Sequence, residues 1–321
     1  MLTTTKHPFY GGVRFGGTCE SEMQCYEWNM FHTQPRPRRS CLYMPASNMR
    51  ALEKAKSLPA DTIIFDLEDA VAPDAKVEAR ANACAAVRSD EYGKRELVVR
   101  INGMETPWFA EDLRQACLSG ADAVLVPKIL NAGDIGRISS LLDEHDKDAK
   151  TSLWAMIEMP LAIVNLGAIA ATGPDTRLTS FVMGFNDLAK EMHAEHDRTI
   201  FGPVMTQAVI AARAYGLNII DSVYNDFNDP DGLERECREA GKLGFDGKSL
   251  IHPAQIETAN RVFAPQAEAI AEAQAIIAAF KDPVNAGKGV LVVDGKMTEL
   301  LHYRQAKQLV ATAEAIAALA K

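Results

Sequence analysis

Residues 62–88 read TIIFDLEDAVAPDAKVEARANACAAVR and combine a strand, an acidic loop and a helix. The β-branched and aromatic run 62–65 is typical of a buried strand, and the alanine-rich run 76–88 is typical of a helix. Between them, the carboxylates Asp66, Glu68 and Asp69 follow the predicted strand. The stretch therefore predicts one βα unit with acidic side chains at the carboxyl end of its strand.

The same alternation continues on both sides of this unit. Further strand-like apolar runs lie at residues 41–44, 97–101, 123–126, 153–157, 178–183, 217–220 and 248–251. Helix-like stretches lie between them at residues 49–57, 108–119, 135–144, 161–171, 204–215 and 233–243. Eight strands that alternate with helices fit a closed (β/α)8 TIM barrel better than an open sheet. No GxGxxG motif follows the first strand, so a dinucleotide-binding fold loses its main support.

The start of the chain differs in composition from the barrel pattern. Prolines at alternate positions in the run QPRPRR, residues 34–39, disfavour both a helix and a central strand. We interpret residues 1–37 as an N-terminal extension that is either an arm over the domain or partly disordered. The barrel domain is expected to span residues 38–265.

The end of the chain is also expected to lie outside the barrel. Residues 267–281 predict a helix, residues 290–296 a β-type run that ends in an Asp-Gly turn signal, and residues 299–320 a last helix. This tail is too long to be one more barrel helix. We therefore expect residues 266–321 to form a C-terminal helical lid and oligomerisation segment.

The bulk composition excludes several classes of protein. The net charge is −9 and the isoelectric point about 5.4, so no electrostatic field favours nucleic acid or an anionic membrane. The six cysteines form no CxxC pair, the chain has no secretory signal, and its apolar runs are too short to span a bilayer. We expect reduced thiols in a cytoplasmic protein.

Polar residues follow several predicted strands, where a barrel carries its active site. They are Asp66, Glu68 and Asp69 after the second strand, Arg100 and Asn102 at the third, Lys128 after the fourth, Glu158 after the fifth, and Asn186 and Asp187 after the sixth. Carboxylates crowded at one mouth repel one another, and a hard divalent cation relieves that repulsion. This pattern predicts a Mg²⁺ or Mn²⁺ site.

Glu158 and Asp187 are the candidate metal ligands because they come from neighbouring strands. Glu68 and Asp69 are then expected to act around the metal, by holding the water molecules that complete its coordination. Plainer roles are open for three residues: Asn186 or Asp187 as caps of the following helix, and Asp69 as a cap of the turn at residues 72–74.

The two cations at the mouth also have alternative roles. Arg100 can bind a substrate carboxylate or enolate oxygen with its planar fork, or can form a structural salt bridge with Glu68 or Asp69. Lys128 could form a Schiff base, although the surrounding acids favour its ammonium form. His193 and His196 match no zinc signature and are interpreted as surface or loop residues. No GxSxG elbow is present, so a covalent hydrolase is unsupported.

Six motifs occur in an order that resembles a known superfamily. They are YMPAS at residues 43–47, DLEDAV at 66–71, VRING at 99–103, VPK at 126–128, IE at 157–158 and GFNDL at 184–188. Together they resemble the HpcH/HpaI aldolase and citrate lyase β-subunit superfamily. Within it, the chain is most similar to the stand-alone malyl-CoA, β-methylmalyl-CoA and citramalyl-CoA lyases and to their malyl-CoA thioesterase relatives.

The resemblance implies a cofactor, an assembly and roles for particular residues. It implies Mg²⁺ held by Glu158 and Asp187, substrate oxygens bound by Arg100, and a homotrimer or hexamer in which Asp294 completes the catalytic site of a neighbouring subunit. Coenzyme A contacts are carried over to Tyr43, Lys54 and Arg39. Contacts to the substrate are further expected from Asn186, Asp187, Ile251 and His252.

The expected reaction is cleavage or formation of a carbon–carbon bond in a 3-hydroxy-3-carboxy acyl-CoA such as malyl-CoA, methylmalyl-CoA or citramalyl-CoA. The products are glyoxylate or pyruvate and acetyl-CoA or propionyl-CoA, and Asp294 exchanges a proton with the thioester α-carbon. The alternatives are hydrolysis of (3S)-malyl-CoA at the same site, aldol cleavage of a free 2-oxo acid, a citrate lyase β subunit, and a non-catalytic barrel.

Overall fold

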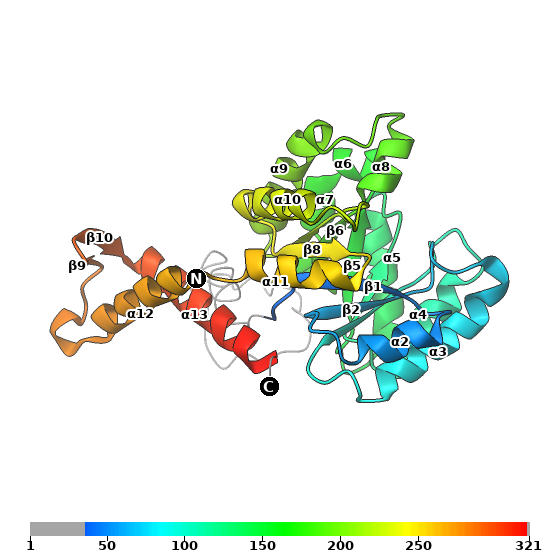
Figure 1. The fold of residues 1–321 in the computed structure, drawn as a ribbon, viewed down its shortest axis with the longest axis horizontal. Coiled ribbons are helices and arrows are strands. Elements are labelled where there is room, and N and C mark those ends of the chain that lie inside the picture. The colour runs from blue at the N-terminus through cyan, green and yellow to red at the C-terminus, as the bar shows by residue number, and fades with distance from the viewer. Residues whose placement is uncertain (1–35, 320–321) are drawn as a thin grey trace, which may run out of the picture.

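The computed structural model describes residues 36–319 and contains a closed barrel of eight parallel strands in sequence order (Figure 1). The strands are β1 (Ser40–Pro45), β2 (Thr62–Asp66), β3 (Glu96–Arg100), β4 (Ala123–Val126), β5 (Ser152–Ile157), β6 (Leu178–Met183), β7 (Asn218–Asp221) and β8 (Gly247–Leu250). Pairing of β1 with β8 closes the barrel. The predicted TIM barrel is therefore confirmed. The N-terminal extension lies outside the described residues, apart from Arg36 and Pro37.

Helices surround the strands, and most of them agree with the predicted stretches. They are α2 (Met49–Ala55), α3 (Lys76–Arg88), α4 (Phe109–Ser119), α5 (Ala132–His145), α6 (Pro160–Val164), α7 (Leu166–Ala170), α8 (Phe185–Glu191), α9 (Arg198–Ala214), α10 (Pro230–Leu243) and α11 (Ile256–Phe263). Short 3₁₀ turns lie at η1 (Pro73–Ala75), η2 (Gly173–Asp175) and η3 (Pro253–Gln255).

Two helix predictions were wrong for local reasons. The helix predicted over residues 161–171 is divided at Asn165, whose side-chain amide donates a hydrogen bond to the Leu130 carbonyl at 2.9 Å. The helix predicted over residues 204–215 begins six positions earlier, at Arg198, and contains Pro203. It can begin there because the Asp197 side chain accepts a hydrogen bond from Thr199 N at 2.9 Å and so caps it.

Apolar side chains fill both the inside of the barrel and the layer between strands and helices. The inner cluster consists of Cys41, Ile64, Val98, Ala123, Leu125, Trp154, Met156, Val182 and Ile220. An arginine lies at each end of this cluster. Arg38 stacks over the Trp154 ring at 5.1 Å at the amino end, and Arg100 Nη1 lies 3.9 Å from Met156 Sδ at the carboxyl end. The barrel is thus a packed core, and its chemistry is confined to the mouth.

A run of arginines fastens the start of the described chain across the amino ends of the strands. Arg36 pairs with Asp122 at 2.9 Å. Arg38 binds Glu96 through two nitrogens at 2.6 and 2.7 Å. Arg39 binds Asp61 through Nε and Nη2, each at 2.8 Å. These ion pairs lie at the end of the barrel opposite to the expected active site.

The C-terminal segment forms an arm that projects from the barrel (Figure 1). It contains α12 (Ala267–Lys281), the 3₁₀ turn η4 (Pro283–Asn285), β9 (Val290–Val293), β10 (Lys296–Glu299) and α13 (Leu300–Leu319). The strands form a hairpin whose turn residues, Asp294 and Gly295, have φ angles of 49° and 77°, as a two-residue hairpin turn requires. The second strand was not predicted, because the run KMTE has little β propensity.

Two further expectations concern membranes and thiols. Among residues 36–319, no helix combines the length and apolar character of a membrane span. The four cysteines in this part of the chain, Cys41, Cys84, Cys117 and Cys237, are free and buried, in agreement with reduced thiols.

Gly247, the first residue of β8, packs against the arginine-rich segment at the amino end of the barrel. A Cβ on Gly247 would lie 1.8 Å from the Arg38 carbonyl oxygen, which the neighbouring arginine ion pairs hold in place. We predict that Gly247→Ala lowers the free energy of unfolding by at least about 2 kcal/mol in urea denaturation. Gly136→Ala in α5, where the new Cβ meets nothing within 4 Å, should be neutral or stabilising. Equal losses in both variants would contradict this account.

Candidate active site

The Arg100 guanidinium lies at the centre of the barrel mouth and is held mainly by Asp66. Arg100 Nε and Nη2 each donate to one oxygen of Asp66 at 2.7 Å, and both residues are buried. The same carboxylate also accepts the backbone N–H groups of Glu68 and Ala70 at 2.8 and 3.1 Å. Asp66 therefore fixes both the arginine and the acidic loop that follows β2. Asp66 thus occupies the Nε–Nη2 edge of the guanidinium, and the binding of substrate by Arg100 stays a prediction.

The third guanidinium nitrogen of Arg100 faces the two other acids of this loop. Arg100 Nη1 lies 3.0 Å from Glu68 Oε2 and 3.3 Å from Asp69 Oδ2. The structural salt bridges considered for Arg100 are therefore present. The 3₁₀ turn η1 has no side-chain cap, so Asp69 does not cap it. Glu68 and Asp69 instead surround the one nitrogen of Arg100 that Asp66 leaves available.

Lys128 completes this charged cluster from the loop after β4. Its Nζ lies 3.1 Å from Glu68 Oε1. Burial lowers the pKa of Lys128, but the charge and hydrogen bond of Glu68 outweigh it and raise the pKa above its ordinary value. A lysine that keeps its proton is a poor nucleophile, so the Schiff-base alternative has no support here.

Glu158, at the end of β5, is the most deeply buried acid of the mouth. Its side chain has no solvent exposure, and Oε1 accepts the Lys128 backbone N–H at 2.8 Å. The other oxygen, Oε2, is buried without a hydrogen-bond partner. Burial, reinforced by the charges of Glu68 and Asp187, raises the pKa of Glu158 to about 8. This carboxylate is therefore short of one positively charged partner.

The loop after β6 encloses the free oxygen of Glu158. A Cβ on Gly184 would lie 2.7 Å from both Glu158 Cβ and Glu158 Oε2, so only glycine fits there. Asp187 follows in the first turn of α8 and is partly exposed. The structure records no side-chain cap for α8, so neither Asn186 nor Asp187 serves as the cap considered for it.

The residues present fit a small divalent cation held by Glu158 and Asp187. Mg²⁺ binds one or two protein carboxylates and completes its shell with water and substrate oxygens. The partnerless oxygen of Glu158, its raised pKa and the nearby charge of Asp187 are the features that such an ion would relieve. Within residues 36–319, no group of three or more His, Cys, Asp or Glu side chains could hold a metal. A cation here would therefore rest on this pair of acids.

Four other predicted residues line the mouth or lie beside it. The Tyr43 ring stacks on the Arg100 guanidinium at 4.8 Å, and its hydroxyl is buried without a partner. Asn186 exchanges side-chain hydrogen bonds with Asn225, at 3.3 and 2.9 Å. Ile251 and His252 follow β8, and their backbone N–H groups donate to Gln255 Oε1 at 2.9 and 3.1 Å.

Three of the residues predicted for the site lie away from the mouth of their own barrel. Arg39 precedes β1, at the amino end of the barrel, where Asp61 binds it. Arg39 therefore lies at the end of the barrel opposite to the strand-end carboxylates, and its expected coenzyme A contact stays a prediction. Lys54 is exposed in the last turn of α2. Asp294 is exposed at the tip of the projecting hairpin (Figure 1).

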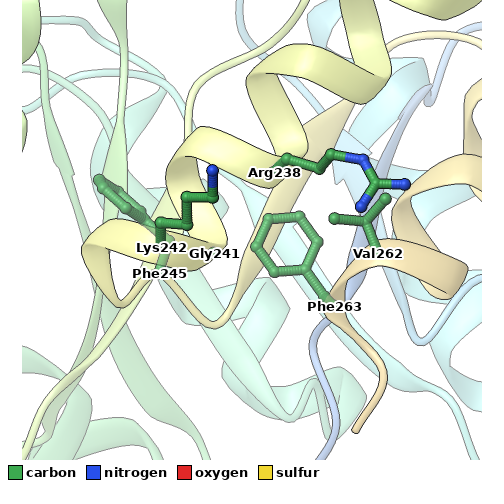
Figure 2. Close-up of a pocket in the computed structure, with 6 residues that line it drawn as sticks. All are labelled: Arg238, Gly241, Lys242, Phe245, Val262 and Phe263. Carbon is green, nitrogen blue, oxygen red and sulfur yellow. The ribbon is translucent and has the colours of Figure 1, made fainter. Parts of the chain in front are cut away.

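Two cavities differ in their chemical content. One, of about 300 Å³, opens beside the cluster and is lined by Glu68, Asp69, Val71, Pro73, Lys76, Asn102, Gly103, Glu105, Thr106, Trp108 and Lys128. The other, of about 400 Å³, is formed by the ends of α10 and α11 and the loop to β8 (Figure 2). Arg238, Lys242 and Phe263 line it without any acid. The smaller cavity is the candidate substrate site, because it adjoins the strand-end carboxylates.

Sequence reasoning did not assign a site role to Asp66. It was recognised only as the first acid after a strand, and in the structure it is the last residue of β2 and the partner of Arg100. The available signal was the facing register of the two strands, since Asp66 lies directly opposite Arg100 in the β2–β3 pair.

Comparisons with known proteins establish the family of the chain. The model of the HpcH/HpaI aldolase/citrate lyase family matches residues 39–253, which include the strand ends described above. A (3S)-malyl-CoA thioesterase of Cereibacter sphaeroides is 47% identical over 89% of this chain and 98% of its own length. An L-malyl-CoA/beta-methylmalyl-CoA lyase of Cereibacter sphaeroides is 32% identical over 90% of this chain and 99% of its own length.

A solved structure shows the same fold in a relative. The protein CitE of Mycobacterium tuberculosis, in complex with magnesium, acetoacetate and coenzyme A, is 27% identical and superposes with a TM-score of 0.66. The match covers 86% of this chain and 97% of that one. The chain belongs to the HpcH/HpaI aldolase/citrate lyase family.

Proposed function

We propose that this protein hydrolyses the thioester of a 3-carboxy-3-hydroxy acyl-CoA of the malyl-CoA type. The observation that carries the proposal is the 47% identity with a (3S)-malyl-CoA thioesterase over almost the whole length of that enzyme. Carbon–carbon cleavage was ranked first from the sequence, and hydrolysis second. The relatives reverse this order, since the malyl-CoA lyase is only 32% identical.

The mouth offers a group for each end of such a substrate. The substrate carries a carboxylate and a hydroxyl side by side, and these groups suit a cation held by Glu158 and Asp187. When bound, that cation would neutralise and orient the substrate oxygens. We propose, from the family resemblance, that the coenzyme A portion lies near the loop after β1, close to Tyr43 and α2. The M. tuberculosis protein, whose structure is a complex with magnesium and coenzyme A, supports this class of ligand.

The chain's own residues supply the remaining chemistry. Water attacks the thioester carbonyl carbon, the carbon–sulfur bond breaks, and the products are the free acid and coenzyme A thiol. Arg100 Nη1, the nitrogen that Asp66 does not bind, would donate to the oxygen that gains negative charge. The carboxylate of Asp294, from a second copy of the chain, would accept the proton that the attacking water loses and return it to the departing sulfur.

Cleavage of the carbon–carbon bond remains the second candidate. Its support is the family itself, which includes lyases, and the citrate lyase subunit beta of Leuconostoc mesenteroides subsp. cremoris at 35% identity. The same groups would serve it, with Arg100 bound to a thioester enolate and Asp294 exchanging a proton with the α-carbon. Glyoxylate or pyruvate would then be the second product.

The products formed from (3S)-malyl-CoA distinguish the two reactions. We predict free malate and coenzyme A thiol, with little glyoxylate or acetyl-CoA, when the purified chain is assayed by liquid chromatography and mass spectrometry. Activity should disappear in EDTA and return with Mg²⁺ or Mn²⁺. Glyoxylate and acetyl-CoA in equal amounts would instead establish a lyase, and unchanged activity in EDTA would contradict the metal assignment.

The position of Asp294 supports a site shared between copies of the chain. The hairpin that carries it lies at the far end of the arm from the barrel of its own chain (Figure 1). The arm exposes large apolar side chains, including Val284, Val292 and Met297 at 79%, 76% and 70%. Exposed apolar surface of this kind favours an interface, so we propose that the arm covers the mouth of a neighbouring barrel in a homotrimer or hexamer.

Mixed oligomers test whether Asp294 acts on a neighbouring site. Asp294→Ala chains and Glu158→Ala chains should each be inactive as homo-oligomers. We predict that co-expression restores part of the activity, because some interfaces then pair an intact arm with an intact mouth. Tagged subunits purified in two affinity steps establish that mixed oligomers formed. Mixed oligomers without activity would show that Asp294 does not serve a neighbouring site.

A further inference from the structure

The helix that carries Asp187 begins without a capping side chain of its own. Helix α8 starts at Phe185, and its N-cap is Gly184, which has no side chain to accept a hydrogen bond. The usual capping residues cannot stand there, because any Cβ would strike Glu158 at 2.7 Å. The close packing of Glu158 against this loop therefore leaves the first N–H groups of α8 without a local partner.

A serine from the next strand supplies the missing oxygen. Ser222 follows β7, and its Oγ accepts the Phe185 N–H at 3.0 Å. Both residues are almost fully buried, at 1% and 2% exposure, so water cannot replace this bond. The Phe185 ring is also fixed, stacked on Phe201 at 4.6 Å. The position of Asp187, two residues further on, thus depends on a hydroxyl that belongs to another βα unit.

Ser222 is itself held by a buried ion network between β7, β8 and the outer helices. Its backbone N–H donates to Asp221 Oδ1 at 2.8 Å. Asp221 is paired with Lys248 at 2.7 Å and with Arg198 at 3.0 Å. Glu236 on α10 also pairs with both cations, at 2.9 and 3.2 Å. This network fixes the backbone at the end of β7. The Ser222 hydroxyl is therefore held in one position relative to the start of α8.

A second, exposed contact joins the same two loops. The side chains of Asn186 and Asn225 exchange hydrogen bonds at 3.3 and 2.9 Å, one residue before Asp187 and three after Ser222. The start of α8 is therefore attached to the loop after β7 at two points.

We propose that Ser222 is a positioning residue for Asp187, which it places opposite Glu158 for divalent-cation binding. The inference rests on the proposed metal site. Metal binding would then depend on Ser222, although Ser222 touches neither the cation nor the substrate. Removing the hydroxyl frees a buried N–H at the start of α8 and lets Asp187 move. Loss of such a supporting contact typically weakens metal binding by about 10- to 100-fold.

Titration of Mn²⁺ by electron paramagnetic resonance, without substrate, measures this effect directly. We predict that Ser222→Ala raises the Mn²⁺ dissociation constant roughly tenfold. Ser180→Ala is the matched control, since Ser180 is a fully buried serine on β6 whose hydroxyl has no hydrogen-bond partner. That variant should bind Mn²⁺ as the wild type does.

The outcomes separate this inference from the proposed function. If the wild type and Glu158→Gln bind Mn²⁺ equally, the metal site itself is wrong. If Glu158→Gln loses the ion while Ser222→Ala binds it as tightly as the wild type, the role of Ser222 is wrong. Should Ser222→Ala fail to fold, Ser222→Cys decides, because the thiol occupies similar space but accepts the Phe185 N–H much more weakly than the hydroxyl. Unchanged Mn²⁺ affinity in that variant would overturn the inference.

Discussion

Glu158 is a carboxylate without solvent exposure, and one of its oxygens has no hydrogen-bond partner. An isolated buried charge of this kind is unfavourable, and Glu68 and Asp187 add like charge to it. Without a positive partner, such a group is neutralised by a proton, and its raised pKa reflects this; a bound cation would hold it ionised. The geometry of the mouth accommodates this group: Gly184 makes room for the carboxylate, and Ser222 replaces the cap that Gly184 cannot provide.

The second constraint is the assignment of the Arg100 nitrogens. Asp66 binds Nε and Nη2, which fixes the guanidinium and leaves Nη1 to other partners. Glu68 and Asp69 lie at that nitrogen, and Lys128 bridges to Glu68. Charges of both signs are thus arranged before any ligand arrives, and little reorganisation is needed during the reaction. Such a mouth is suited to stabilising negative charge on a thioester oxygen.

The barrel and most of its strand-end residues could be predicted from the sequence, because both depend on local patterns. Apolar runs set the strands, and the residue that follows each strand must lie at the mouth. The arginine fork could not be assigned in this way, since it depends on the register of β2 against β3. Arg39 directly precedes β1 and therefore lies at the amino end of the barrel, but its partner there, Asp61, could not be read from the sequence. The role of Ser222 depends on a contact across 37 residues.

Thermal unfolding with and without Mg²⁺, for the wild type and Glu158→Gln, tests the central claim most directly. Because burial raises the pKa of Glu158, the neutral glutamine should leave the metal-free protein at least as stable as the wild type. Mg²⁺ at about 100 times its dissociation constant should stabilise the wild type by about 2.7 kcal/mol and leave Glu158→Gln unchanged. An equal rise in melting temperature in both proteins, or none in the wild type, would contradict the account.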